Sequence, residues 1–133
     1  SYYETEGFFD EFGRLERITD DNGNHTVYTY DVLDRRTKVR TGIALGNLFD
    51  VSEMVYDNGD AGDSNLTLVR QHVTTSSDRE TEFRYDDRNR LVWTINELAP
   101  HTYNEYDNLN RVVRTYVSST APTAIEAPAQ ANR

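Results

Sequence analysis

The feature that most constrains this chain is a six-residue pattern that recurs along it. The pattern reads aromatic, Asp, any two residues, one of Gly, Asp or Asn, and then Arg. By chance, an aromatic-Asp-x-x-x-Arg sequence is expected roughly 0.1 times in a chain of this length and composition. Four copies lie at 9–14, 30–35, 85–90 and 106–111, and a fifth copy at 56–66 carries an insertion. Self-similarity at this period predicts an array of similar structural units.

The residue types give the pattern a physical meaning. Gly, Asn and Asp tolerate a positive φ best, so the fifth position predicts a tight turn. The Asp can accept hydrogen bonds from backbone N–H groups of that turn. The Arg can pair with this Asp or with one of a neighbouring repeat, and the aromatic ring ends the incoming strand and supplies buried area. The motif residues predicted to be structural are Phe9, Asp10, Gly13, Arg14, Tyr30, Asp31, Arg35, Tyr56, Asp57, Tyr85, Asp86, Arg90, Tyr106, Asp107 and Arg111.

The segments between the motifs are typical of β-strands. Residues 25–30, 80–85, 91–95 and 111–117 alternate in character or are rich in β-branched and aromatic side chains. Further turn signals lie at 21–24, 42–47, 76–78 and 99–100. No apolar stripe with a helical period is long enough to predict a helix. The sequence therefore predicts an all-β fold of tandem antiparallel hairpins over residues 1–117, in one twisted or coiling sheet.

The end of the chain differs in composition from the repeats. Residues 118–133 are rich in Ala, contain Pro122 and Pro128, and have no aromatic side chain. This composition predicts an extended or mobile tail. Two interpretations remain open: a linker to another domain, or an arm that docks on a neighbouring copy of the chain.

The repeats resemble a known family. The segments FDEFGRLERITDDNGNHTVYTYD (9–31), YDDRNRLVWT (85–94) and YDNLNRVVRT (106–115) are similar to the YD repeats, also called RHS repeats. These repeats occur in bacterial RHS proteins, in toxin-complex shell proteins and in teneurins. The resemblance implies that such hairpins join into a long sheet that coils into a hollow shell, and it implies an extracellular or cell-surface location. Four to five repeats are too few to close a shell. The sequence also lacks the core-end segment at which some family members cleave themselves and carries no toxin domain, so proteolysis and toxicity are not expected of this chain.

Charge and composition exclude several classes of function. The net charge is −9, which argues against binding to phosphate backbones or anionic membranes, and we expect neither a nucleic-acid partner nor membrane insertion. The chain has no Cys, which excludes disulfide scaffolds and thiol catalysis. Of its 14 basic residues only Lys38 is a Lys, and the others are Arg. The planar guanidinium of Arg can pair with carboxylates and stack on aromatic rings. Because the chain begins with Ser, we expect a fragment or a processed product.

The sequence gives little support to an enzyme or a metal centre. His25, His72 and His101 are far apart and lack metal-ligand spacing, and we expect no cofactor. The segment 57–65 is dense in oxygen-bearing side chains, and Asp57, Asp60 and Asp63 form a candidate calcium loop. Its Asp spacing does not match an EF-hand, so an acidic surface loop is the simpler interpretation.

Aromatic side chains allow one further interpretation. Exposed rings can bind the apolar faces of sugars, and Trp93 and Tyr103 are the main candidates for a glycan platform. Tyr2, Tyr3, Phe8 and Tyr116 could extend it. The alternative is that these rings stack repeat on repeat.

Together these observations favour a non-enzymatic structural segment of an RHS-repeat surface or secreted protein. A carbohydrate-binding module is the alternative. The expected partners are adjoining YD repeats, or further copies of the chain joined head to tail through strand edges into a fibre or tube.

Overall fold

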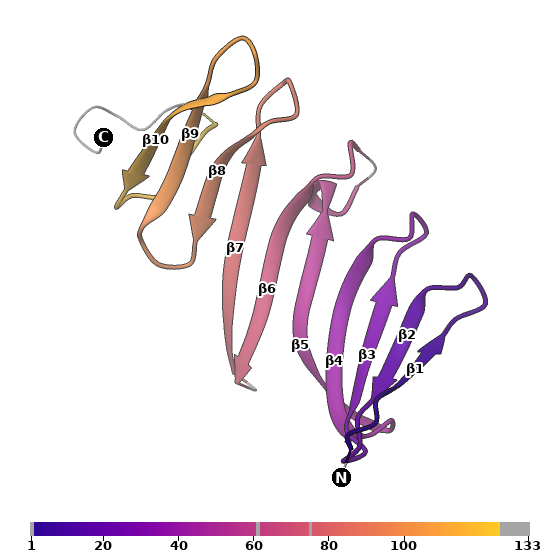
Figure 1. The fold of residues 1–133 in the computed structure, drawn as a ribbon. Helices are drawn as coiled ribbons and strands as arrows, with labels where there is room; N and C mark the ends of the chain where they lie inside the picture. The colour runs from indigo at the N-terminus through magenta and orange to yellow at the C-terminus, as the bar shows by residue number, and fades with distance from the viewer. Residues whose placement is uncertain (1, 61, 75, 126–133) are drawn as a thin grey trace. The chain divides into compact units, whose positions relative to one another are not determined.

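The chain folds into ten β-strands that are neighbours in chain order (Figure 1). The structure is a computed structural model that describes residues 2–60, 62–74 and 76–125. Every strand pair with a defined register is antiparallel. Among the described residues the helical structure is limited to a three-residue 3-10 turn, η1 (Asp57–Gly59). The prediction of an all-β fold of tandem hairpins is confirmed.

The chain forms two compact units, which we describe separately. Unit 1 comprises Ser1–Met54 and Gln71–Asp78, and unit 2 comprises Val55–Arg70 and Arg79–Arg133. The strands are β1 (Glu6–Phe9), β2 (Leu15–Thr19), β3 (His25–Tyr30), β4 (Arg36–Ala44), β5 (Asn47–Tyr56), β6 (Leu66–Thr74), β7 (Ser77–Tyr85), β8 (Leu91–Asn96), β9 (His101–Tyr106) and β10 (Val112–Ser118). Strands β5, β6 and β7 contribute residues to both units.

The longer repeats are longer mainly in their strands. Strands β4 to β7 have 9 or 10 residues, whereas the other six have 4 to 7. The turn expected at 42–47 is reduced to residues 45 and 46, because β4 continues to Ala44 and β5 begins at Asn47. Gly42 permits this extension, since a Cβ there would collide with the Asn47 carbonyl oxygen. The irregular spacing of the motifs therefore reflects strand length as well as loop insertions.

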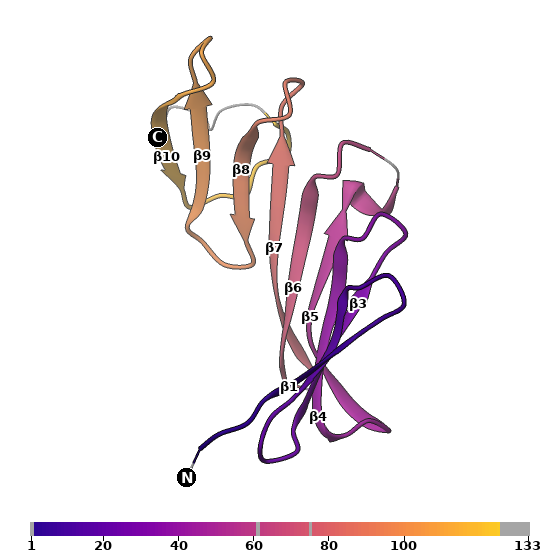
Figure 2. The same ribbon diagram turned by 45° about the vertical axis from the view of Figure 1, so that its right-hand side comes forward.

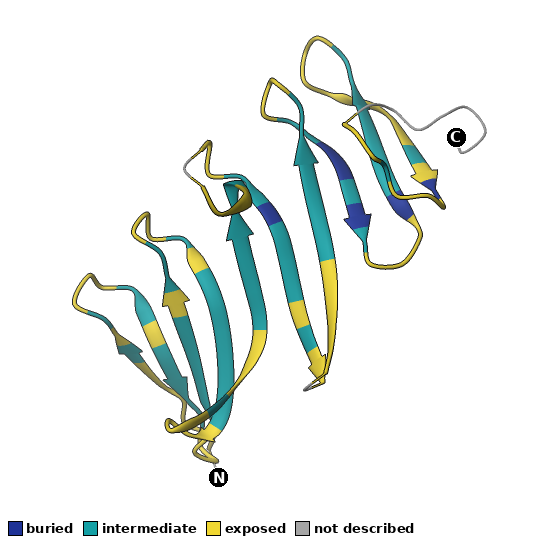
Figure 3. Cartoon of the chain, turned by 180° about the vertical axis from the view of Figure 1, so that it is seen from behind, coloured by how far each residue is buried: buried dark blue, intermediate teal, exposed yellow. Residues whose placement is uncertain are grey.

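Unit 2 contains the buried hydrophobic cluster of the described chain. The cluster consists of Val92, Trp93 and Ile95 of β8, and Tyr103 and Tyr106 of β9 pack against it. Figure 3 shows dark blue, buried segments on β8 and on strands near it. Trp93 is only 1 % exposed, and its ring lies 5.1 Å from that of Tyr103. The proposal of Trp93 as an exposed sugar-binding ring is therefore wrong.

The tail contacts the sheet at a residue beside this cluster. Arg84 of β7 lies opposite Trp93 in the strand register, so the two side chains share a face of the sheet. The Arg84 Nη1 group donates to the Pro122 carbonyl at 3.2 Å. Figure 2 shows the segment after β10 running back toward β7. The segment after β10 thus contacts its own unit at Pro122, and residues 126–133 of the expected tail lie outside the described residues.

All four uninterrupted motifs have a positive φ at their fifth residue. The values are +79° for Gly13, +61° for Asp34, +62° for Asn89 and +61° for Asn110. In each unit these motif turns lie at one end of the strands (Figure 1). The position requires a left-handed backbone, which explains why only Gly, Asp and Asn occupy it.

Gly13→Ala is expected to lower the free energy of unfolding by about 1 kcal/mol, because an L-residue is strained at this φ. Space is not limiting, since a Cβ at this position would meet no other atom within 4 Å. Gly46→Ala is the matched control, because that turn glycine also has open space and lacks a positive φ. Urea unfolding of both variants measures the difference. Equal losses would contradict the backbone explanation.

Candidate functional site

Each uninterrupted motif closes the same hydrogen-bonded turn. In the copy at 85–90, Asp86 N donates to Arg90 O and Asn89 N donates to Asp86 O, both at 3.0 Å. The Asp86 carboxylate accepts the N–H groups of Arg88 and Arg90 at 3.0 Å, and Arg90 Nε at 2.8 Å. One carboxylate therefore organises the whole turn and orients the arginine. Equivalent bonds close the turns at 10–14, 31–35 and 107–111.

A turn of the same kind closes the other end of the first repeat. Asp20 N donates to Asn24 O at 3.0 Å, and the Asp20 carboxylate accepts the N–H groups of Asn22 at 3.0 Å and Asn24 at 2.8 Å. Asn24 replaces the arginine and donates its Nδ2 to Asp20 at 2.8 Å. Asp20 was not predicted as a turn residue, because the turn signal was assigned to residues 21–24. The Asp-x-x-Gly spacing to Gly23 was the available signal.

The motif turns are also linked to one another. In unit 1, the Tyr30 hydroxyl donates to the Leu15 carbonyl at 2.7 Å. The Arg14 Nη1 group donates to Asp34 Oδ1 at 2.6 Å and to Asp31 O at 3.4 Å. The guanidinium of Arg14 also lies over the Tyr30 ring, 4.8 Å from its centroid. We call this set of contacts between consecutive motif turns a joint.

The same joint recurs in unit 2. The Tyr106 hydroxyl donates to the Leu91 carbonyl at 2.7 Å. Arg90 Nη1 donates to Asp107 O at 3.1 Å and to Asn110 Oδ1 at 3.3 Å. The Arg90 guanidinium lies 4.8 Å from the Tyr106 ring centroid. The two alternatives left open for the motif arginine are thus both realised, since it binds its own Asp and the following turn.

The interrupted copy forms a joint with different residues. Asn65 takes the position of the arginine, because its carbonyl accepts Asp57 N at 2.8 Å. Its Nδ2 donates to Asn89 Oδ1, which is the fifth position of the following turn. The Tyr85 hydroxyl donates to the Leu66 carbonyl at 3.0 Å. All three joints described therefore contain two contacts. A tyrosine hydroxyl donates to a backbone carbonyl of the preceding repeat, and a side chain of the preceding turn donates to the residue at the fifth motif position.

The first and last motifs differ from those between them. Phe9 has no hydroxyl and is 66 % exposed, so the expectation that this ring supplies buried area is wrong. It precedes the first turn, and β1 begins the strand order. At the other end, Arg111 binds its own Asp107 at 2.7 Å, yet its side chain is 71 % exposed. The corresponding side chain of Arg90 is only 19 % exposed.

The turns hold their carboxylates in the charged form. Partial burial works to raise the pKa of Asp86, but hydrogen bonds from Arg90 and Arg88 outweigh it and hold that pKa below its ordinary value of 3.8. The same balance lowers the pKa of Asp10 and of Asp31. For Asp107 the backbone and side-chain bonds from Arg111 are the larger influence, and its pKa is also lowered. These groups favour the folded state only while they are ionised.

We expect the fold to lose stability as the pH falls below about 4. A carboxylate with a lowered pKa contributes its full stabilisation above its unfolded-state pKa and loses it as the pH falls through the folded-state pKa. At higher pH, as the pH approaches the isoelectric point near 4.7, protonation of other carboxylates reduces the repulsion between negative charges and favours the folded state. Urea midpoints should stay level or rise slightly from neutral pH toward the isoelectric point and then fall below about pH 4. Asp86→Asn should show a smaller acid-dependent loss, and a midpoint that rises below pH 4 would contradict the prediction.

Unit 1 brings together charged residues that the sequence spacing did not connect. Ligand atoms of Asp50, Glu53 and His72 lie within 4.8 Å of one another. Lys38 Nζ binds both carboxylates, at 3.1 Å to Asp50 and 2.6 Å to Glu53. The Lys38 ammonium thus supplies a cation to this group, and hydrogen bonds to Glu53 and then Asp50 raise the pKa of Lys38. His72 Nδ1 lies 2.8 Å from Asp78.

Asp57 in the acidic loop at 57–65 stabilises the turn through hydrogen bonds. The Asp57 carboxylate accepts the N–H groups of Asn65 at 2.9 Å and Ser64 at 3.2 Å. Among the residues that the structure describes, close sets of three ligand atoms are confined to the Asp50 group, and the calcium candidates Asp57, Asp60 and Asp63 do not form one. The candidate calcium loop therefore receives no support from this geometry.

Similar hairpin turns that follow one another along the chain, each hydrogen-bonded to the next, define a tandem-repeat β protein. Residues 9–42, which contain the first two motif turns, match the family model described as RHS Repeat. Residues 9–42 therefore match an RHS, or YD, repeat, and the resemblance seen in the sequence is confirmed for this part of the chain. No curated protein matches the chain.

Similar chains occur in several solved structures, two of which follow. A chain in "Crystal Structure of TcdB2-TccC3-Cdc42" matches 90 % of this chain with a TM-score of 0.71 and 20 % identity. A chain in "Crystal Structure of TcdB2-TccC3-TEV" matches 87 % with a TM-score of 0.41 and 16 % identity. This chain spans only 6 % and 7 % of those chains. The first likeness shows the fold that the two chains share.

In the part of the chain that the structure describes, no helix has the length and apolar character needed to cross a membrane.

Proposed function

We propose that the chain is a non-enzymatic length of repeat wall that continues at its edges into adjoining RHS repeats of a larger extracellular or cell-surface protein. One observation carries this proposal: the charged motif residues are used within the turns and joints. Asp86 binds three N–H groups of its own turn, and Arg90 binds that carboxylate and the next turn. Groups committed in this way support a wall and are poorly placed to act on a substrate.

A repeat wall should accept one additional period. A variant that duplicates residues 85–105, inserted after Glu105, places a second Tyr-Asp turn in the array at the natural spacing of 21 residues. Because each repeat contacts mainly its neighbours, we expect this variant to fold and to unfold with an equal or larger free energy. Insertion of the same residues in scrambled order is the matched control. Circular dichroism and urea unfolding report the result, and equal damage by both insertions would contradict the proposal.

The observed burial does not favour the glycan alternative. Tyr103 is half-buried, with its ring 5.1 Å from Trp93 on one side and 6.0 Å from Tyr116 on the other. Its faces therefore pack within the sheet, as repeat-on-repeat stacking predicts. We expect no specific binding on a glycan array. Binding that disappears in Tyr103→Ala while the fold is retained would favour the carbohydrate module.

A further inference from the structure

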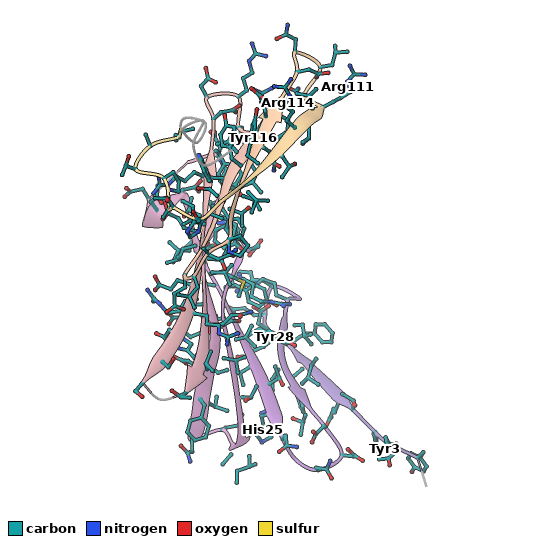
Figure 4. The ribbon with its side chains drawn as sticks, turned by 90° about the vertical axis from the view of Figure 1, so that its left-hand side faces the viewer. Tyr3, His25, Tyr28, Arg111, Arg114 and Tyr116 are labelled. Atoms are coloured by element: carbon teal, nitrogen blue, oxygen red, sulfur yellow. The ribbon has the colours of Figure 1, made fainter. Side chains whose placement is uncertain are left out.

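The last motif contains the two groups that the earlier turn contributes to a joint, an arginine and the backbone carbonyl of the residue after it. Arg111 is the sixth residue of its motif, as Arg14 and Arg90 are of theirs. Its side chain is 71 % exposed, whereas the side chains of Arg14 and Arg90 are 24 % and 19 % exposed. Figure 4 shows Arg111 at the turn end of the last hairpin. The residue after it, Val112, corresponds to Leu15 and Leu91, whose carbonyls accept tyrosine hydroxyls. Strand β10 ends the strand order of the described chain.

We propose that this edge selects the hairpin that joins it by two side chains. One is a tyrosine before the Asp, whose hydroxyl donates to the Val112 carbonyl. The other is an Asn or Asp at the fifth motif position, which accepts a hydrogen bond from Arg111. The inference deepens the proposed function and rests on it. Its basis is that the three joints described all contain both contacts, including the joint in which Asn65 replaces the arginine.

The chain's own first hairpin lacks both groups. Phe9 has no hydroxyl to donate, and Gly13 has no side chain to accept. Only the Asp10 carbonyl remains for Arg111, as one of the two contacts that the Asp31 and Asp107 turns offer to Arg14 and Arg90. A head-to-tail contact between two copies would thus leave the Val112 carbonyl and part of the Arg111 guanidinium without the partners that other joints provide. The edge fits a Tyr-type RHS hairpin from elsewhere better than a second copy of this chain.

The double variant Phe9→Tyr, Gly13→Asn supplies both missing groups and tests the proposal in the full chain. Each added hydrogen bond is modest, so we expect the dissociation constant for self-association to fall about ten- to a hundredfold. Sedimentation equilibrium at high salt, where the net charge of −9 is screened, measures it. Asn is compatible with the backbone at position 13, because Asn89 and Asn110 have positive φ in the same place.

Adding Arg111→Gln to the double variant is the matched control and should remove most of the gain. Phe9→Tyr alone alters an exposed ring, so it keeps the test valid if the double variant folds poorly, and several-fold tightening is expected. Equal association of the wild type and the double variant, including no association of either, would overturn the selection. An effect that persists without Arg111 would do the same. The duplication experiment tests the repeat wall independently, so failure here leaves that proposal standing.

Discussion

Trp93→Ala is expected to lower the free energy of unfolding by about 3–5 kcal/mol, the usual cost of truncating a buried aromatic side chain to Ala. The ring is 1 % exposed and belongs to a hydrophobic cluster with only two other buried members, Val92 and Ile95. Such a small cluster has few neighbours that can close the cavity. Urea unfolding followed by circular dichroism measures the loss, because the variant contains no tryptophan for fluorescence.

Leu109→Ala is the control for this substitution. Leu109 lies in a motif turn and is 71 % exposed, so its removal should change the unfolding free energy by less than about 0.5 kcal/mol. A loss of less than about 1.5 kcal/mol in Trp93→Ala would show that the ring does not pack as described.

Asp86→Ala is expected to cost about 1–2 kcal/mol of unfolding free energy. The substitution removes the acceptor of three N–H groups and leaves the partly buried Arg90 without its carboxylate. Its exposed neighbour Asp87 has the same charge, so Asp87→Ala separates the turn contacts from the change in net charge. Thermal and urea unfolding of the two variants should differ clearly. Equal effects would assign the loss to charge, and an unchanged stability with lost ligand binding would make Asp86 a functional residue.

The turns could be predicted from the sequence because their geometry depends on local residue types. An Asp three residues before Gly, Asn or Asp specifies the turn, and the recurrence of that spacing located four of them. The joints were only partly predictable, since the acceptor of Arg14 in the next turn depends on strand register. The Tyr30 hydroxyl bond to the Leu15 carbonyl had no signal in a single sequence.

Burial was harder to predict than the turns. Alternation places Trp93 on one face of its strand, but the coverage of that face depends on distant segments. Here the tail reaches Arg84 beside it through Pro122. The grouping of His72 with Asp50 and Glu53 was missed for a related reason. It depends on the length of β5 and β6, which extend beyond the short strands that the repeats suggested.

The strand order has a consequence for how this chain acquires its structure. Since every strand neighbours the one made just before it, contacts join residues that are close in sequence, which favours fast folding. Each turn can also close by itself, because its Asp and Arg are four residues apart. A hairpin leaving the ribosome would therefore find the carbonyl and the guanidinium of its predecessor already in place. Synthesis from the N-terminus would add hairpins one at a time, with each finished turn guiding the next.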